Sequence, residues 1–133
     1  MSAQTYTLSA TTQQEQAQAI QSVREELAEQ GFGVLCEIDV QATLQQKLGE
    51  QIEPYVILGA CNPWFAHQAL MREPTLGTLL PCNVVVYSAG GETHIAAVDA
   101  QRMLSIVGNE ALEPIAAEIA SRLARVVHRA ASR

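Results

Sequence analysis

Residues 55–63, Tyr-Val-Ile-Leu-Gly-Ala-Cys-Asn-Pro, decide the fold of this chain. The apolar run from Tyr55 to Cys61 has no polar face, which is typical of a strand in the middle of a sheet. Asn62 is a favoured N-cap, and Pro63 is favoured at the first position of a helix. We therefore predict a central strand that leads directly into a helix.

Downstream, the pattern predicts a β-hairpin. Residues 82–87 form a second apolar segment, and Gly90-Gly91 separates it from a third segment at residues 92–98. Two glycines between such segments are typical of a tight turn between antiparallel strands. We expect the preceding stretch, residues 74–81, to be extended and long enough to return the chain to the end of the sheet where the first strand stops.

Upstream, residues 6–8 predict a short strand, and the next helix begins near residue 13. Thr12 and Glu15 have the spacing of a capping box, and Gly31 can adopt the left-handed conformation that ends a helix. The sequence therefore predicts that this half of the chain also alternates between strands and helices.

Residues 33–39 alternate as a strand does, which places Cys36 with the core residues. Asp39 then has the position of an N-cap for a short helix that closes at Gly49. We therefore expect Cys36 to be buried and Asp39 to cap the helix.

The last helix is the clearest element. Its apolar side chains follow helical spacing, and Pro114 marks the start of its regular part. The stripe comprises Leu112, Ile115, Ile119, Leu123, Val126 and Val127. Together the elements predict the α+β class: one two-layer domain over residues 1–133, with helices packed on a mainly antiparallel sheet and a long C-terminal amphipathic helix.

Composition excludes several classes of protein. The chain is acidic, with a formal net charge of −6, and it lacks the clustered cations that a nucleic-acid partner requires. No apolar stretch approaches the ~20 residues of a membrane span. Residues 1–16 lack a basic region followed by an apolar run, so we expect a cytoplasmic protein. The three cysteines are odd in number and lack zinc-site spacing, so neither a disulfide framework nor a metal site is predicted.

Two Cys-Asn pairs are the strongest candidates for a functional site. Cys61-Asn62 and Cys82-Asn83 each stand at the end of a predicted strand, and the return of the chain brings the two ends together. Cys61 also precedes a helix start, where the helix dipole favours a thiolate. The alternative is that both cysteines are small buried residues, which free cysteines often are.

Other residues have possible supporting roles. Glu37, Asp39 and Lys47 are candidate charged neighbours of the site, although helix capping explains Asp39 and the helix dipole explains Lys47. Trp64 and Phe65 follow Pro63, and we expect one of these aromatics to be exposed as a dimer contact or a ligand wall. The histidines, among them His94, are scattered and are expected at the surface.

The sequence resembles the domain-of-unknown-function family numbered 302 over about residues 31–128. The motifs that carry the resemblance are Gly31-Phe32-Gly33, Glu37-Ile38-Asp39, Lys47-Leu48-Gly49, Gly59-Ala60-Cys61-Asn62-Pro63, Ala66, Leu70 and Leu79-Leu80-Pro81-Cys82-Asn83. Cys36 departs from the pattern, since the family usually has Thr or a similar residue there. The resemblance implies a small α+β fold, often dimeric, with no established activity.

Two functional hypotheses follow. The first is a cytoplasmic thiol protein in which Cys61 and Cys82 handle sulfur, redox equivalents or a soft metal. The alternative is a non-catalytic homodimeric module that binds a small ligand or a peptide near Trp64 and Phe65. The GxSxG, HExxH, P-loop and Rossmann motifs do not occur, so the sequence assigns neither an enzymatic activity nor a cofactor.

Overall fold

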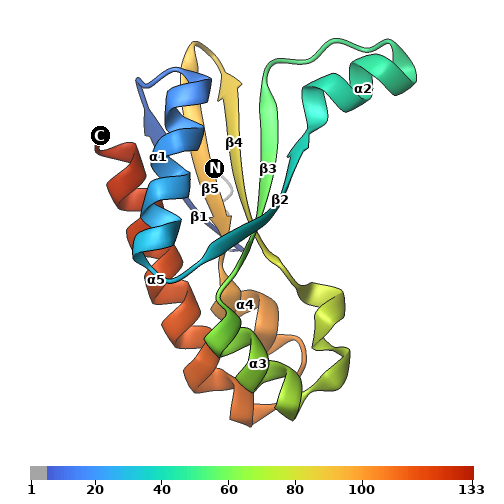
Figure 1. The fold of residues 1–133 in the computed structure, drawn as a ribbon, viewed down its shortest axis with the longest axis vertical. Coiled ribbons are helices and arrows are strands. Elements are labelled where there is room, and N and C mark those ends of the chain that lie inside the picture. The colour runs from blue at the N-terminus through green and yellow to red at the C-terminus, as the bar shows by residue number, and fades with distance from the viewer. Residues whose placement is uncertain (1–5) are drawn as a thin grey trace.

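The computed structural model describes residues 6–133, so residues 1–5 of the polar amino-terminal stretch lie outside it. Within the described range, five strands form one antiparallel sheet in the order β1-β5-β4-β3-β2. The strands are β1 (Thr7–Thr12), β2 (Gly33–Asp39), β3 (Tyr55–Cys61), β4 (Cys82–Ala89) and β5 (Glu92–Val98). The helices are α1 (Gln16–Glu29), α2 (Val40–Leu48), α3 (Pro63–Arg72), α4 (Ala100–Ser105) and α5 (Glu113–Ala131), with 3-10 segments η1 (Pro74–Leu79) and η2 (Glu110–Leu112). The predicted α+β class is confirmed (Figure 1).

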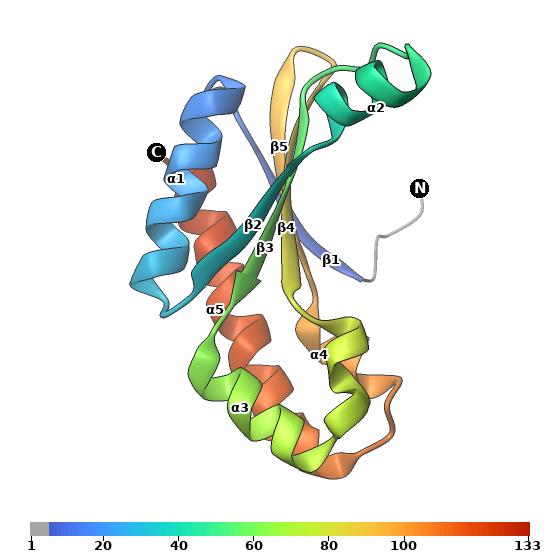
Figure 2. The ribbon, with the colours of Figure 1, turned by 45° about the vertical axis from the view of Figure 1, so that its right-hand side comes forward.

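One face of the sheet is covered by α1 and α5 (Figure 2). Because side chains alternate along a strand, every second residue of β3, β4 and β5 meets these helices. The predicted apolar stripe of α5 is buried at every position, from Leu112 to Val127. The strand side chains buried against it are Val56, Leu58, Ala60, Cys82, Val84, Val86, Ile95 and Ala97. This layer is the hydrophobic core.

The opposite face of the sheet, called the open face below, has no helix of residues 6–133 lying over it (Figure 2). Strand register arranges its side chains in three rows across the sheet. The rows are Cys36, Gly59, Asn83, Val98 and Thr7; then Ile38, Ile57, Val85, Ala96 and Ser9; then Tyr55, Tyr87, His94 and Thr11. Most of these side chains are half-buried or exposed. This face of the sheet is therefore accessible to solvent.

Two predicted details of the amino-terminal half are wrong. Thr12 is the last residue of β1 rather than an N-cap, and its Oγ1 accepts a hydrogen bond from the Gln14 backbone N–H at 3.2 Å. Glu15 is the N-cap of α1, but its side chain makes no capping hydrogen bond. The strand extends further than predicted because it pairs with β5 along its whole length.

Cys36 is exposed, which contradicts its predicted place in the core. A β-bulge between Val34 and Cys36 inserts Leu35 into the strand, and an inserted residue shifts every following side chain to the other face. Val34 therefore packs against the core, whereas Cys36 falls on the open face.

The predicted extended segment at residues 74–81 is also different. Residues 74–79 form η1, which contacts α3, so the chain goes out along α3 and returns through a 3-10 turn (Figure 1). The return itself is as predicted, because Cys82 pairs with Ala60 at the end of β3. Within residues 6–133, every helix is too short or too polar to cross a membrane.

The segment from Val40 to Pro54, called the α2 arm below, projects from one end of the sheet (Figure 1). Asp39 caps α2 by accepting a hydrogen bond from the Ala42 N–H at 2.9 Å, and Gly49 ends it in the left-handed conformation, as predicted. None of the described residues of α2 is buried, although Leu44 and Leu48 give it an apolar side. The arm is therefore held by its two strand connections and its caps rather than by a core of its own.

Candidate functional site

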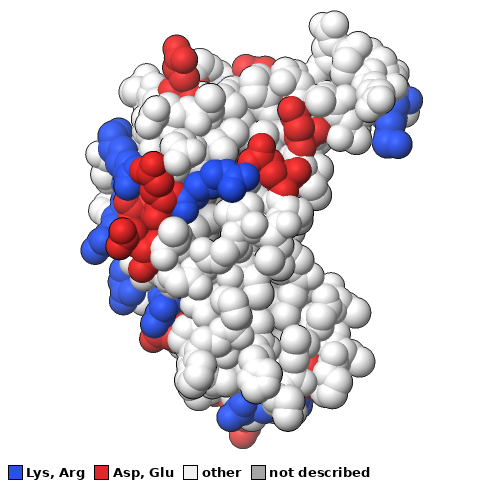
Figure 3. Space-filling model, viewed as in Figure 1, with Lys and Arg blue, Asp and Glu red and all other residues white. Residues whose placement is uncertain are grey.

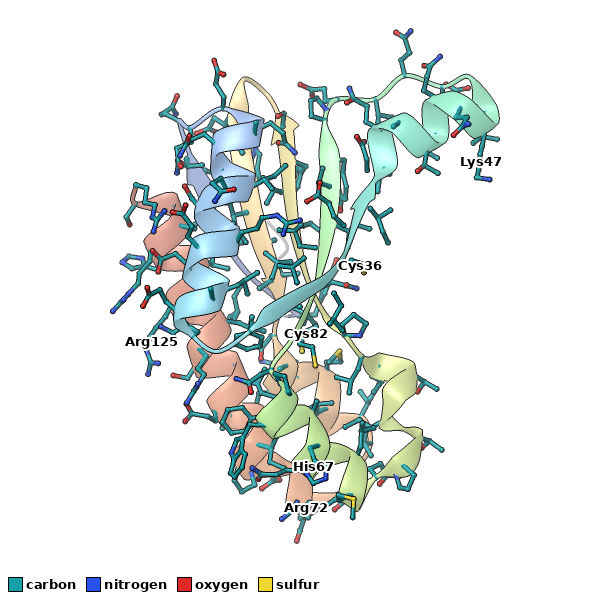
Figure 4. The ribbon with its side chains drawn as sticks, in the orientation of Figure 1. Cys36, Lys47, His67, Arg72, Cys82 and Arg125 are labelled. Carbon is teal, nitrogen blue, oxygen red and sulfur yellow. The ribbon has the colours of Figure 1, made fainter. Side chains whose placement is uncertain are left out.

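The two Cys-Asn pairs lie at neighbouring strand ends. Cys61 ends β3 and Cys82 begins β4, and the pairing of Ala60 with Cys82 sets the two cysteines diagonally across the ladder. The predicted convergence of these residues at one end of the sheet is therefore confirmed. Figure 4 shows Cys82 at this end, beneath Cys36.

The four residues of the pairs have different surroundings. Cys82 and Asn62 are buried, Cys61 is half-buried and Asn83 is exposed on the open face. Cys61 and Cys82 line a cavity of about 20 Å³, which is room for about one water molecule. A small organic ligand does not fit in this cavity.

Asn62 has a structural role. Its Oδ1 accepts a hydrogen bond from the Phe65 N–H at 3.4 Å, and its Nδ2 donates to the Gln30 carbonyl at 3.4 Å. The same carbonyl accepts a hydrogen bond from Arg122 at 3.0 Å. Asn62 thus caps α3, as predicted, and also links α3 to the end of α1.

The expectation that the helix start lowers the pKa of Cys61 is wrong, since burial raises it. Burial, and secondly the neighbouring Cys61, raise the pKa of Cys82 to about 11. The start of α3 offers little to a thiolate because Pro63 has no N–H and Asn62 already bonds the N–H of Phe65. Both thiols are therefore protonated at neutral pH, whereas the thiolate is the nucleophile and the metal ligand.

Because Gly59 has no side chain, the thiol of a third cysteine, Cys36, packs against its backbone. A Cβ at position 59 would lie 2.6 Å from Cys36 Sγ and 2.9 Å from Pro81 Cγ. Both distances are shorter than a Cβ tolerates, so the thiol of Cys36 and the ring of Pro81 pack directly over the glycine backbone. Among the described residues, no group of three or more His, Cys, Asp and Glu side chains has the arrangement of a metal site.

The predicted supporting residues are not at this site. Glu37 forms an ion pair with Arg24 of α1, and Asp39 caps α2. Lys47 lies on the α2 arm, far from Cys82 (Figure 4). Glu37 and Asp39 therefore interact with other parts of the fold, and Lys47 lies too far away to support the cysteines.

Of the two predicted aromatics, Trp64 is exposed, with 71% of its surface accessible. Phe65 instead packs against the core, and the Arg122 guanidinium lies 5.1 Å from the centre of its ring. The prediction that one of the pair is exposed is confirmed, but the two do not form a common surface.

Residues 8–130 match the family model described as "Domain of unknown function DUF302". The chain belongs to this family. The chain is similar to an uncharacterized conserved DUF302 protein from Bacillus stearothermophilus, whose crystal structure is known. The two sequences are 32% identical, and the structures superimpose with a TM-score of 0.90 over 95% of this chain and 98% of that chain. No curated protein matches the chain. The resemblance seen in the sequence is confirmed, and it extends further toward the amino terminus, through β1 and α1.

The DUF302 fold also brings together residues that the sequence argument missed. Tyr55, Tyr87 and His94 stack side by side on the open face, one from each of three neighbouring strands. The signal was present, because Tyr87 stands three residues before Gly90 and His94 three residues after Gly91. A two-residue hairpin pairs such positions directly.

Proposed function

We propose that this DUF302 protein is a non-catalytic homodimeric module that binds a small ligand on the open face of its sheet. The observation that carries the proposal is this uncovered face, with its central row of Ile38, Ile57, Val85 and Ala96 and its stacked rings. A face of this kind in a folded domain favours a partner or a ligand. Figure 3 shows the surface indented between the α2 arm and the α3 end of the molecule, with few charges around the indentation.

The dimer contact is assigned to the β2 edge and the α2 arm. Four large apolar side chains are exposed there: Leu35 (67%), Ile38 (45%), Leu48 (69%) and Ile52 (37%). In a twofold dimer the same patch lies on both copies, so an apolar arm beside an apolar sheet face can cover the equivalent surface of a second copy. This arrangement supports a partner of the same chain.

The raised pKa values of Cys61 and Cys82 favour a binding function over thiol catalysis. The cavity that these two cysteines help to line has a volume of only about 20 Å³. The open face instead has a hollow of about 380 Å³ over β1, β4 and β5, which falls within the size range of ligand sites.

Native mass spectrometry of the protein purified from its own host tests both parts of the proposal. We expect a mass of two 14.4 kDa chains with a bound species that is lost on denaturation. A bare 14.4 kDa chain would contradict the proposal. A species that persists after denaturation and disappears on reduction would favour thiol chemistry instead.

Matched variants locate the dimer contact. Leu48→Ser on the α2 arm is expected to weaken the dimer at least tenfold, whereas Trp64→Ser on α3 is expected to leave it unchanged, although the two side chains are equally exposed. Sedimentation equilibrium measures both. Dissociation by Trp64→Ser alone would move the interface to α3 and overturn the assignment.

The thiol hypothesis remains the second candidate because Cys61 and Cys82 lie at adjoining strand ends. Titration with a coloured disulfide reagent at pH 7.5 decides it. We expect the exposed Cys36 to react first, and Cys61 and Cys82 to react only slowly until denaturant is added. Rapid reaction of Cys61 or Cys82 in the folded protein would favour the thiol function over the binding module. The single variants Cys61→Ser and Cys82→Ser assign the phases.

A further inference from the structure

We infer that the stack of Tyr55, Tyr87 and His94 ends in a binding site for a flat heteroaromatic ligand, seated over Thr11 against the free face of the His94 ring. The inference rests on the proposed binding function, because it names the ligand class of that module. It does not depend on the dimer.

The stack has the spacing of the sheet itself. The ring centres of Tyr55 and Tyr87 are 5.2 Å apart with planes 19° apart, and those of Tyr87 and His94 are 4.8 Å apart with planes 8° apart. Neighbouring strands are separated by about 4.8 Å. The rings therefore stand in consecutive places of one row, each contributed by the next strand along the sheet.

The fourth place in this row has no ring. Register pairs His94 with Thr11 of β1, and Thr11 is exposed. The neighbouring positions on the open face, Ser9 and Ala96, are also small. A hollow of about 380 Å³ is lined by Ser9, Ala10, Thr11, Tyr87, His94 and Ala96. One side of this hollow is formed by His94, so a ring of the ligand would continue the stack by one strand spacing.

Hydrogen-bonding groups in the hollow indicate a heteroaromatic ring rather than a hydrocarbon. His94 Nε2 lies 3.2 Å from the Ala89 carbonyl oxygen, which only accepts, so Nε2 carries the proton. Ser9 and Thr11, whose side chains carry hydroxyl groups, are among the lining residues of the hollow. A flat ligand that stacks on His94 holds its ring N–H in its own plane, so the hydroxyls of Ser9 and Thr11 are the acceptors available to it.

A second hollow, between α4 and the start of α5, is of similar size but has a different character. Its volume is about 390 Å³, and its lining includes the carboxylates Glu110 and Glu113 but no aromatic ring. It therefore offers no stacking surface. We therefore expect a flat aromatic ligand to bind in the hollow beside His94 and not in the hollow between α4 and α5.

Titration of isotope-labelled protein with indole, followed by NMR, tests the site. Indole is flat and carries a ring N–H, and we expect it to shift the signals of the His94 ring and the Thr11 methyl group in a saturable way. Cyclohexanol, which is of similar bulk but not aromatic, is expected to bind at least tenfold more weakly. Stacking interactions of this kind commonly change affinity by about tenfold or more.

Two leucine variants supply the matched comparison. His94→Leu removes the terminal ring and is expected to weaken indole binding about tenfold. Tyr55→Leu removes a ring at the far end of the same stack, outside the hollow, and is expected to change it less than twofold. Circular dichroism and thermal melting confirm that both variants fold.

The outcomes separate this inference from the proposed function. Indole shifts confined to other residues, or equal losses in the two variants, would overturn the ligand site, while sedimentation and native mass spectrometry would still decide the module itself. If indole binds at His94 and the protein is a monomer, the ligand site would be supported and the proposed homodimer would be rejected.

Discussion

The two faces of the sheet are built from the same strands, yet they differ in what covers them. Leu58 faces α1 and α5 and is fully buried, whereas its neighbour Ile57 faces the open side and is only half-buried. The same alternation separates Cys82, which is buried, from the exposed Asn83. The comparison indicates that the helix-covered face contains the core of this fold and that the open face remains accessible to solvent.

The largest expected effect tests this division directly. Leu58→Ala removes a fully buried side chain and should lower the free energy of unfolding by about 2–5 kcal/mol. Ile57→Ala should cost less, about 1 kcal/mol, because part of the Ile57 side chain is already in contact with water. Urea denaturation at low protein concentration measures both variants. Equal losses would show that the open face is as much a part of the core as the covered face.

The second prediction uses the buried thiol of the covered face. The pKa of Cys82 is raised to about 11 from an ordinary value of 9.0, so the unfolded chain ionises first as the pH rises. The stability associated with the neutral thiol is complete below pH 9 and is lost between about pH 9 and pH 11, by about 2–3 kcal/mol. Denaturation curves across this range measure the loss. Cys82→Ala is the control and should have a flatter profile, and an unchanged profile would contradict the prediction.

The third prediction concerns Gly59, where Cys36 and Pro81 pack closely over the backbone of the open face. Gly59→Ala should cost about 1–3 kcal/mol, because the new Cβ would meet Cys36 Sγ and Pro81 Cγ. Adding Cys36→Ala should recover part of this loss, although the contact with Pro81 remains.

Gly33→Ala is the matched control in the neighbouring strand. A Cβ there has no described atom within 4 Å, so the change should stay within about 0.5 kcal/mol. A double-mutant cycle in thermal denaturation measures the coupling between positions 36 and 59. Strict additivity of the two changes would contradict the packing described here.

The smallest expected effect concerns the α2 arm. Leu48→Ala should change the stability of the monomer by less than about 0.5 kcal/mol, because the side chain is 69% exposed. At concentrations where the dimer forms, the same variant should lose more stability than the wild type. Denaturation at two protein concentrations measures the difference, and a concentration-independent result would count against the arm as the dimer contact.

Much of the fold follows from local signals in the sequence. Asn62-Pro63, Asp39 with Gly49, and Gly90-Gly91 act within a few residues, and each produced the predicted cap or turn. The apolar stripe of α5 could be predicted for a similar reason. Its helical spacing is a local pattern, and the residues of this stripe are the ones that are buried.

The errors come from contacts between distant segments. The bulge at Leu35 depends on the pairing of β2 with β3, and it moved Cys36 from the predicted core to the open face. The raised pKa of Cys61 depends on how neighbouring segments bury it, which outweighs the local helix start. Cys61 and Cys82 were brought to adjoining strand ends as predicted, but the supporting residues were not, and the protonation of the thiols depends on the packed structure.

The bulge in β2 also affects how the protein behaves in a crowded solution. β2 lies at the edge of the sheet, and a regular edge strand is a template on which further chains can add and grow into fibres. The extra residue at Leu35 interrupts the even spacing of donors and acceptors along this edge. An incoming strand would lose its hydrogen-bond register after a few residues. The irregularity that places Cys36 on the open face is thus also one of the features by which edge strands resist the addition of further chains.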